Sequence, residues 1–225
     1  MVRDREQGLR VARAGAERFG LAPAPLRLIH DSPEGDGFVY EADRGGQPAI
    51  LKVGISDEQR LPGARAKAEF VAYLGSRGAQ VAPPYRSAVG LLVETIYDDD
   101  ALLALTAYPK APGSPLNSAD PRQCTAAVRE QWGRVMGRFH ALAQEYEYGY
   151  RRCPAGEQLP TDSPCPVGDW RSEHAFFATW DVDEEVKGLW REVGDALAAL
   201  PQPPNGFGLI HNDMHSHNMI LGEGR

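Results

Sequence analysis

The residues best suited to chemistry lie in a polar segment, 211–218, between two short apolar runs near the end of the printed sequence. Such runs are typical of short buried strands, which would present the polar segment on a rigid support. The segment reads His211, one other residue, Asp213, four other residues, and Asn218. In phosphoryl transfer, a carboxylate orients an acceptor hydroxyl and takes its proton, and an amide oxygen shortly after it binds Mg²⁺. Asp213 and Asn218 fit these two roles, and we assign His211 to support the geometry of the loop.

Two other interpretations of this segment stay open. Four residues alternate along it, namely His211, Asp213, His215 and His217. A cluster of imidazoles and a carboxylate could bind Zn²⁺ or another transition metal in a hydrolase, although little sequence follows to supply further ligands. The segment could also be a polar surface turn between two strands. The elements upstream therefore have to decide between these interpretations.

A lysine upstream is a candidate partner for a phosphate group. Lys52 lies in the otherwise apolar run 49–53, where a fully buried ammonium without an anionic partner would cost roughly several kcal/mol. Strand alternation places Ile50 and Lys52 on the same face. Glu69 lies at the edge of the apolar stripe of a predicted helix, 62–74, and could pair with Lys52. The alternatives are a lysine that extends from an edge strand into water and a glutamate that is merely solvated.

A glycine-bearing turn at 31–37 could fold over the phosphates of a nucleotide. Gly35 and Gly37 would let backbone amides approach a phosphate closely. Two acidic residues in the same turn, Glu34 and Asp36, are unfavourable beside a triphosphate. A plain hairpin loop is therefore an equal alternative.

The remaining sequence changes character near its middle. The patterns predict an amphipathic helix at 4–19 and strands at 26–29, 38–42, 49–53, 91–96 and 101–108. A Pro- and Gly-rich connection at 109–113 ends this strand-rich part. Downstream, the periodicity predicts helices that open at Asp120 and that span 169–180 and 183–200. We therefore expect an antiparallel sheet with helices, followed by a mostly helical part.

The polar segment resembles the catalytic loop of the aminoglycoside phosphotransferase and choline kinase superfamily, which commonly runs His-Gly-Asp-Leu-His-x-x-Asn. Asn212 and Met214 replace the usual Gly and Leu, and His215 stands where that family often has His. The order of the parts upstream extends the resemblance over nearly the whole sequence. It implies an α+β, protein-kinase-like bilobal fold, with an N-lobe at 1–108 built on an antiparallel sheet, a hinge at 109–113, and a mostly helical, incomplete C-lobe at 114–225.

The resemblance also implies a donor nucleotide, ATP or GTP, bound with Mg²⁺. Lys52 would hold the α- and β-phosphates, Glu69 would fix Lys52, and Asn218 would bind the metal ion. The other residues expected around the nucleotide are Val39 and Ile50 over the base, Gly35 and Gly37 near the phosphates, and Ala107, Tyr108 and Lys110 at the hinge. The acceptor would be a hydroxyl of a small molecule that the sequence does not identify.

A further expectation concerns the end of the printed sequence. The family's second magnesium ligand, an Asp in the next strand, has no counterpart before Arg225. We therefore expect residues 1–225 alone to be inactive as an enzyme. A non-catalytic, pseudokinase-like module that binds a nucleotide is the alternative function.

Composition and charge exclude several classes of protein. A formal net charge of −7 and a pI near 5.4 argue against a protein that binds nucleic acid by neutralising its phosphates. No apolar run is long enough to span a bilayer, and the first residues lack the apolar core of a signal peptide. The cysteines, Cys124, Cys153 and Cys165, are odd in number and widely spaced, which favours free thiols in a reducing compartment. We expect a cytoplasmic protein, and the sequence does not indicate its oligomeric state.

Overall fold

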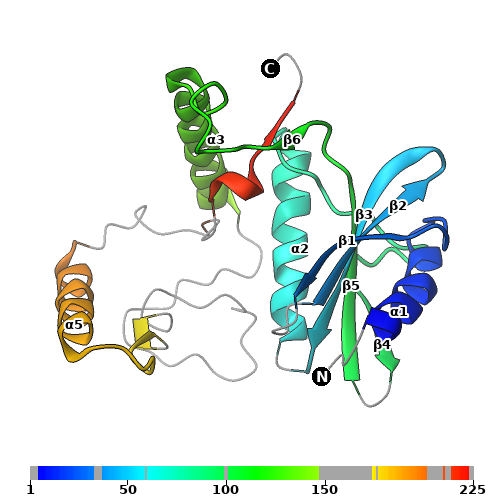
Figure 1. The fold of residues 1–225 in the computed structure, drawn as a ribbon, viewed down its shortest axis with the longest axis horizontal. Coiled ribbons are helices and arrows are strands. Elements are labelled where there is room, and N and C mark those ends of the chain that lie inside the picture. The colour runs from blue at the N-terminus through cyan, green and yellow to red at the C-terminus, as the bar shows by residue number, and fades with distance from the viewer. Residues whose placement is uncertain are drawn as a thin grey trace. The chain divides into compact units, whose positions relative to one another are not determined.

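The computed structural model of the protein describes residues 5–32, 37–58, 60–98, 101–146, 174–175, 177–201, 210 and 214–222. The chain forms two compact units, one made of Met1–Tyr146 with Ile210–Arg225 and the other of Glu147–Leu209. The first unit holds a five-stranded sheet, three described α-helices and the end of the chain (Figure 1). The division into lobes at 109–113 stays a prediction.

Five antiparallel strands form the sheet of the first unit. They are β1 (Arg27–Ser32), β2 (Gly37–Arg44), β3 (Gln47–Ser56), β4 (Glu94–Asp98) and β5 (Ala101–Pro109), in the spatial order β1-β2-β3-β5-β4. The predicted antiparallel sheet is confirmed, with strand ends shifted by a few residues. Gly45 and Gly46 form the turn that connects β2 to β3. Their φ angles are 62° and 86°, which glycine adopts without a steric penalty. The central strand of the sheet, β3, carries Lys52.

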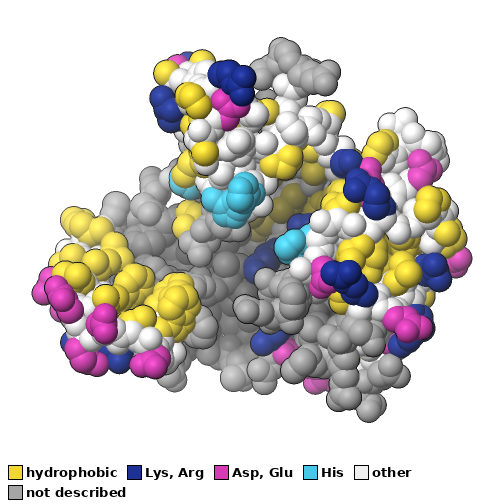
Figure 2. Space-filling model, in the orientation of Figure 1, with side chains coloured by type: hydrophobic (Ala, Val, Ile, Leu, Met, Phe, Trp, Pro, Cys, Tyr) yellow, Lys and Arg dark blue, Asp and Glu magenta, His cyan; other side chains and the backbone are white. Residues whose placement is uncertain are grey.

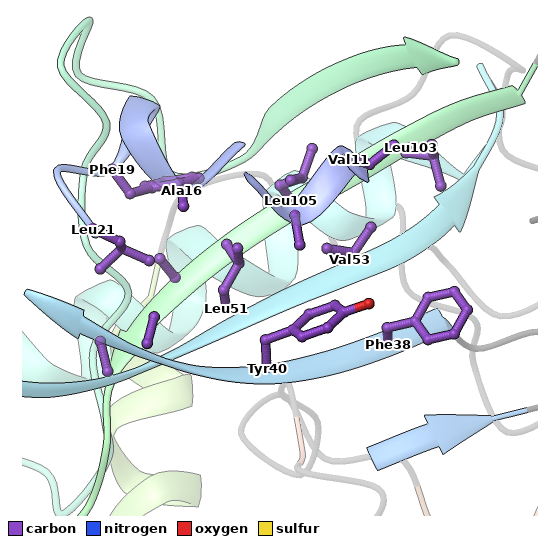
Figure 3. Close-up of a cluster of buried hydrophobic side chains, with 14 residues drawn as sticks. Val11, Ala16, Phe19, Leu21, Phe38, Tyr40, Leu51, Val53, Leu103 and Leu105 are labelled. Carbon is purple, nitrogen blue, oxygen red and sulfur yellow. The ribbon is translucent and has the colours of Figure 1, made fainter. Parts of the chain in front are cut away.

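Helix α1 (Arg5–Arg18) covers one face of the sheet and confirms the helix predicted at 4–19. Its buried residues Val11 and Ala16 pack with Leu51 and Leu105 of the strands (Figure 3). The helix comes close to the sheet because Gly15 has no side chain. A Cβ atom at Gly15 would lie 2.1 Å from Cδ2 of Leu105. This layer is the main hydrophobic core of the first unit.

Helix α2 (Leu61–Ser76) covers the opposite face of the sheet (Figure 1). Ala68 of α2 lies in a cluster against which Ala104 of β5 packs. Ala104 points away from α1, because its neighbours Leu103 and Leu105 are buried in the α1 core and side chains alternate along a strand. The same alternation turns Lys52 toward the α2 side. The helix predicted at 62–74 is confirmed.

Helix α3 (Ala126–Glu145) packs against α2. Leu74 of α2 and Phe139 and Leu142 of α3 form a buried cluster, and Met214 packs against it. The hydroxyl of Tyr73 donates to the carbonyl oxygen of Leu142 at 3.2 Å. Met214, which follows Asp213 in the sequence, therefore packs against side chains of both α2 and α3.

The start of α3 differs from the prediction. The helix begins at Ala126, and Asp120 instead opens a turn in which its carboxylate accepts the N–H of Arg122 at 3.0 Å. The side chain of Thr125 caps α3 by accepting the N–H of Val128 at 3.3 Å. The prediction was wrong because an Asp followed by Pro suits the first residues of a turn as well as those of a helix.

A second, two-stranded antiparallel sheet pairs β6 (Ser114–Pro115) with β7 (Ile220–Leu221). The expected strand at 219–221 is therefore present. Ile210, expected in a buried strand on the other side of the polar segment, is 59% exposed and has no strand partner among the described residues. In the described part of the chain, the polar segment 211–218 is therefore followed by a strand, β7, but not preceded by one.

The second unit is described at 174–175 and 177–201 and contains α5 (Glu184–Ala199), which confirms the helix predicted at 183–200. The ring of His174 stacks on that of Trp190 with centroids 5.0 Å apart. The indole N–H of Trp190 donates to the carbonyl of His174 at 3.0 Å. Most of the helix predicted at 169–180 lies outside the described residues. Among the helices that the structure describes, none is long and apolar enough to cross a membrane.

Candidate active site

The face of the sheet on the α2 side gathers several residues expected around a nucleotide. Lys52 of β3 lies opposite Val39 of β2 and Thr106 of β5. Ile50 of β3 lies opposite Tyr108 of β5. Residues directly opposite in antiparallel strands present their side chains on the same face. These five side chains therefore form one surface. The opposite face of the sheet packs against α1 in the apolar core.

The ammonium group of Lys52 is partly desolvated. Solvent reaches the side chain, yet burial lowers the pKa of Lys52, because protein atoms replace part of the hydration of the charged form. Its Nζ atom lies 5.5 Å from the centroid of the Tyr108 ring, within the range of a cation–π interaction. Lys52 therefore carries a charge that an anion on this face could stabilise.

The expected ion pair between Lys52 and Glu69 is not formed among the described residues. Glu69 is exposed on α2, and Lys52 extends along the sheet toward Tyr108. An aromatic ring stabilises the lysine charge without the entropy loss of fixing a second long side chain. The pairing of Lys52 with Glu69 remains a prediction for the nucleotide-bound protein.

Two backbone groups of the segment expected to meet the base, 107–110, already have partners within the protein. The carbonyl of Ala107 accepts the N–H of Tyr85 at 2.7 Å, and the Ala107 side chain lies in the α1 core. The N–H of Lys110 donates to the carbonyl of Pro48 at 3.0 Å. Within the segment expected to meet the base, the side chain of Tyr108 lies on the Lys52 face, and Nζ of Lys110 donates to Glu41.

Gly37 is required at the start of β2 for a reason that the sequence did not reveal. Its φ is 103°, a conformation that other residues rarely adopt. A Cβ atom there would lie 2.0 Å from the carbonyl oxygen of Val53 in β3. Gly37 thus allows two strands to approach closely, and its expected place near the phosphates stays a prediction. Gly35 lies outside the described residues.

The described part of the candidate catalytic loop is a single 3₁₀ turn, η1 (Ser216–Asn218). His215 caps the turn, since its Nδ1 accepts the N–H of His217 at 3.2 Å and its carbonyl accepts the N–H of Asn218 at 3.0 Å. Figure 2 shows histidine side chains at the surface where Figure 1 places this turn. His211 and Asp213 lie outside the described residues, so their roles stay predictions.

The small β6–β7 sheet ties this loop to the segment that follows the hinge. Beyond the paired strands, the N–H of Leu116 donates to the carbonyl of Met219 at 2.8 Å. Gly113 permits the pairing, because its φ is 116° and a Cβ atom would lie 1.9 Å from the carbonyl oxygen of Leu221. The turn that carries Asn218 is therefore held by the chain that leaves β5.

The donor atoms of the described loop suit a hard cation better than zinc. Asn218 is exposed and offers an amide oxygen, a ligand that Mg²⁺ accepts. Both ring nitrogens of His215 face groups of the loop, Nδ1 toward the N–H of His217 and Nε2 at 3.3 Å from Nδ2 of Asn218. In the described ranges, no group of three or more His, Cys, Asp and Glu side chains is placed to hold a metal ion. The hydrolase interpretation also needs His211 and Asp213, which fall outside those ranges.

Sequence reasoning missed a charge cluster beside this face. Glu41 of β2 lies opposite Ile50 and accepts a hydrogen bond from Nζ of Lys110 at 2.8 Å and another from Arg27. These hydrogen bonds, that of Lys110 first, lower the pKa of Glu41. Strand alternation could have placed Glu41 on the face of Val39. No sequence signal joined it to a lysine that lies 69 residues away.

Comparison with known proteins supplies independent findings. The sequence pattern of the phosphotransferase enzyme family matches residues 33–225. The amicoumacin kinase of Bacillus subtilis (strain 168) is 25% identical over 214 residues, which make up 93% of this chain and 58% of that protein. The chain thus spans less than two thirds of the length of this relative.

Solved structures resemble the protein over nearly its whole length. An amicoumacin kinase in complex with AMP-PNP, Ca²⁺ and Ami has a TM-score of 0.75 and 25% identity, and the match covers 99% of this chain and 62% of that chain. A microcompartment-associated aminopropanol kinase has a TM-score of 0.66 and 20% identity, covering 96% of this chain and 66% of that one. An aminoglycoside-3'-phosphotransferase of type VIII gives 0.56 and 22%, covering 96% and 72%. These similarities confirm the expected kinase-like α+β fold.

Proposed function

The chain belongs to the phosphotransferase enzyme family, and we propose that it transfers the γ-phosphoryl group of ATP or GTP to a hydroxyl group of a small molecule. The chain spans 58% of the length of the amicoumacin kinase that it resembles. The activity of the whole protein is therefore part of the proposal. The relatives are named as kinases of amicoumacin and of aminopropanol and as an aminoglycoside phosphotransferase. An amino alcohol or an aminoglycoside is therefore the class of acceptor to test first.

The observation that carries the proposal is the joint placement of Lys52 and Asn218. Lys52 stands on the central strand, on the face shared with Ile50 and Tyr108. Asn218 stands on a turn that the β6–β7 sheet fastens to the chain leaving β5. Lys52 and Asn218 thus lie in one compact unit, which supports the proposal that Lys52 serves phosphate oxygens and Asn218 a metal ion.

In this proposal, each residue has one task. Lys52 binds the α- and β-phosphates, Glu69 holds Lys52 in place, and Val39 and Ile50 cover the base. Asn218 would hold Mg²⁺ through its side-chain oxygen, and bound Mg²⁺ would supply charge neutralisation for the phosphates. Asp213 orients the acceptor hydroxyl and takes its proton, while His211 supports the loop. Catalysis then comes mainly from positioning and charge stabilisation.

The test is an assay of the gene product with Mg·ATP, Mg·GTP and a panel of amino alcohols and aminoglycosides. We expect acceptor-dependent transfer of phosphate, and a fall in kcat of about 10²–10⁴-fold in Asp213→Asn. His217→Gln, in the same loop, should keep its activity. Full activity in Asp213→Asn would overturn the assigned role. Nucleotide binding without transfer to any acceptor would favour a non-catalytic module, and stoichiometric Zn²⁺ in the purified protein would favour a hydrolase.

A further inference from the structure

The side chain of His215 links the backbone of the 3₁₀ turn to the side chain of Asn218. Its Nδ1 atom accepts the backbone N–H of His217 at 3.2 Å. Its Nε2 atom lies 3.3 Å from Nδ2 of Asn218. The imidazole therefore connects the backbone of the middle residue of the turn, His217, with the side chain of the candidate metal ligand, Asn218.

The chemistry of a neutral imidazole restricts how both contacts can form together. One ring nitrogen carries hydrogen and donates, and the other accepts. Because Nδ1 of His215 accepts from His217, the hydrogen belongs on Nε2, which can then only donate. The NH₂ group of Asn218 also only donates, so Nε2 and Nδ2 do not complement one another. A half-turn of the Asn218 amide brings Oδ1 to the same place and makes the contact a hydrogen bond.

We propose that His215 is a positioning residue for Asn218, in which Nε2–H donates to Oδ1 of the amide while Nδ1 caps the turn. The inference rests on the proposed function, because it takes Asn218 as the metal ligand. A carbonyl oxygen has two lone pairs, so Oδ1 can accept this hydrogen bond and still bind a cation. His215 thereby fixes which end of the exposed amide is available to Mg²⁺.

The matched variants are His215→Asn and His217→Gln. Asparagine is a favoured residue at the start of a helical turn, so His215→Asn keeps a cap for the turn but is too short to reach Asn218 as the imidazole does. His217→Gln changes the neighbouring exposed imidazole and keeps the backbone N–H that His215 binds. Thermal unfolding of both variants shows whether they fold like the wild type.

The first measurement is the affinity for Mn²⁺ in the presence of nucleotide, followed by electron paramagnetic resonance. Partners that orient a metal ligand typically contribute 10–100-fold to metal affinity. We expect His215→Asn to weaken Mn²⁺ binding by about this factor, with metal-free nucleotide binding unchanged, and His217→Gln to bind as the wild type does. Equal Mn²⁺ affinity in His215→Asn and wild type would overturn the inference.

The second measurement needs no metal and no activity. Nitrogen-15 spectra of the histidine rings report which ring nitrogen carries hydrogen, and the variants assign the signals. We expect His215 with hydrogen on Nε2 and a shifted Asn218 side-chain NH₂ signal in His215→Asn. Hydrogen on Nδ1, or an unchanged Asn218 signal, would contradict the inference. A wild type that binds no metal–nucleotide complex but shows the expected spectra would contradict the proposed function and leave the His215–Asn218 hydrogen bond established.

Discussion

Lys52 carries a partly desolvated ammonium on a sheet face where the Tyr108 ring is its described neighbour. A phosphate oxygen would replace this weak contact with a charged hydrogen bond, which contributes roughly 1.5–3 kcal/mol. We therefore predict that Lys52→Met weakens nucleotide binding by about 10–100-fold, measured by isothermal titration calorimetry. Lys67→Met, at an exposed position of α2, is the control and should bind as the wild type does. An unchanged affinity in Lys52→Met would remove Lys52 from the site.

Tyr40 lies in the core under α1 with 2% of its surface exposed, and its hydroxyl has no hydrogen-bond partner among the described residues (Figure 3). A buried hydroxyl without a partner costs about 1–3 kcal/mol. We predict that Tyr40→Phe raises the free energy of unfolding by about 1 kcal/mol in urea titrations. Tyr97→Phe is the control, because Tyr97 is 73% exposed and should be neutral.

The same residue predicts a pH dependence of stability. Burial, and then the charge of Asp31, raise the pKa of Tyr40 to about 12 from 10.0. Between these two pKa values, the unfolded chain releases the Tyr40 proton and the folded chain retains it. The free energy of unfolding is therefore unaffected by titration of Tyr40 below pH 10 and falls as the pH rises toward 12. The loss from Tyr40 should reach about 2–3 kcal/mol. In Tyr40→Phe this component should vanish, and an identical alkaline loss in both proteins would contradict the assignment.

The sequence predicted the face that Lys52 occupies but not what its side chain contacts. Alternation along the strands placed Lys52 beside Ile50, because the period of a strand is fixed by its geometry. The sequence suggested Glu69 as the partner of Lys52, whereas its Nζ atom lies 5.5 Å from the Tyr108 ring, because residue spacing does not fix where a long flexible side chain ends. Likewise, no pattern reveals whether a buried hydroxyl such as that of Tyr40 finds an acceptor.

Glycines inside helices α1 and α3 should respond to the same substitution in opposite ways. A Cβ atom at Gly15 of α1 would lie 2.1 Å from a side-chain atom of Leu105, whereas one at Gly133 of α3 would meet nothing within 4 Å. We predict that Gly15→Ala destabilises the protein by about 1–3 kcal/mol through overpacking. Gly133→Ala should stabilise it by up to about 1 kcal/mol, because alanine favours the helix. Urea titration measures both, and two changes of the same sign would contradict the packing of α1.

Gly113 should be intolerant of a side chain for a different reason. An alanine there must hold φ near 116° and avoid the carbonyl oxygen of Leu221, so the β6–β7 pairing should loosen. We predict faster hydrogen exchange at the N–H of Leu116, which bonds to Met219, and a loss of about 1–3 kcal/mol in stability. Gly45→Ala is the control, since its φ is also positive but no atom lies within 4 Å. Exchange at Leu116 that is no faster in Gly113→Ala than in Gly45→Ala would show that the pairing does not depend on Gly113.

At the level of these elements, the sequence predicted the helices and strands better than their limits and pairings. Periodicity located α1, α2 and α5, because a long stretch of apolar residues at spacings of three and four suits a helix and does not suit a strand or a turn. The pairing of β6 with β7 could not be predicted, since two-residue strands carry no pattern of their own. The start of α3 was misplaced because capping residues also open turns, as Asp120 does here.

A bound nucleotide should stabilise the sheet and the loop together, because the unit Met1–Tyr146 with Ile210–Arg225 contains both Lys52 and Asn218. At a ligand concentration 100 times Kd, the stabilisation should be about 2.7 kcal/mol. We predict slower hydrogen exchange both in β3 and at the N–H of Leu116 when Mg·nucleotide is present. Protection confined to β3 would indicate that the nucleotide does not engage the loop. Lys52→Met at the same ligand concentration is the control.

The arrangement of the whole chain could be predicted only through the order of its parts. The sheet, the helix with Glu69, the hinge and the loop with Asn218 follow one another as in the family, and the fold agrees. Distances across the site could not be predicted, because they depend on helix packing and on close backbone contacts such as those at Gly37 and Gly113. The roles of His211 and Asp213 stay predictions, because both lie outside the described residues.

The β6–β7 pairing also sets an order in time. Its contacts join distant parts of the chain, and the hydrogen bond from the hydroxyl of Ser118 to that of Ser216 spans 98 residues. At roughly 5–20 residues per second, a ribosome needs about 5–20 s to synthesise that interval. All five strands of the sheet, the last of which ends at Pro109, are already synthesised when the interval begins. A growing chain can therefore form the surface around Lys52 many seconds before Asn218 exists, so the part that would hold a nucleotide matures before the part that would use it.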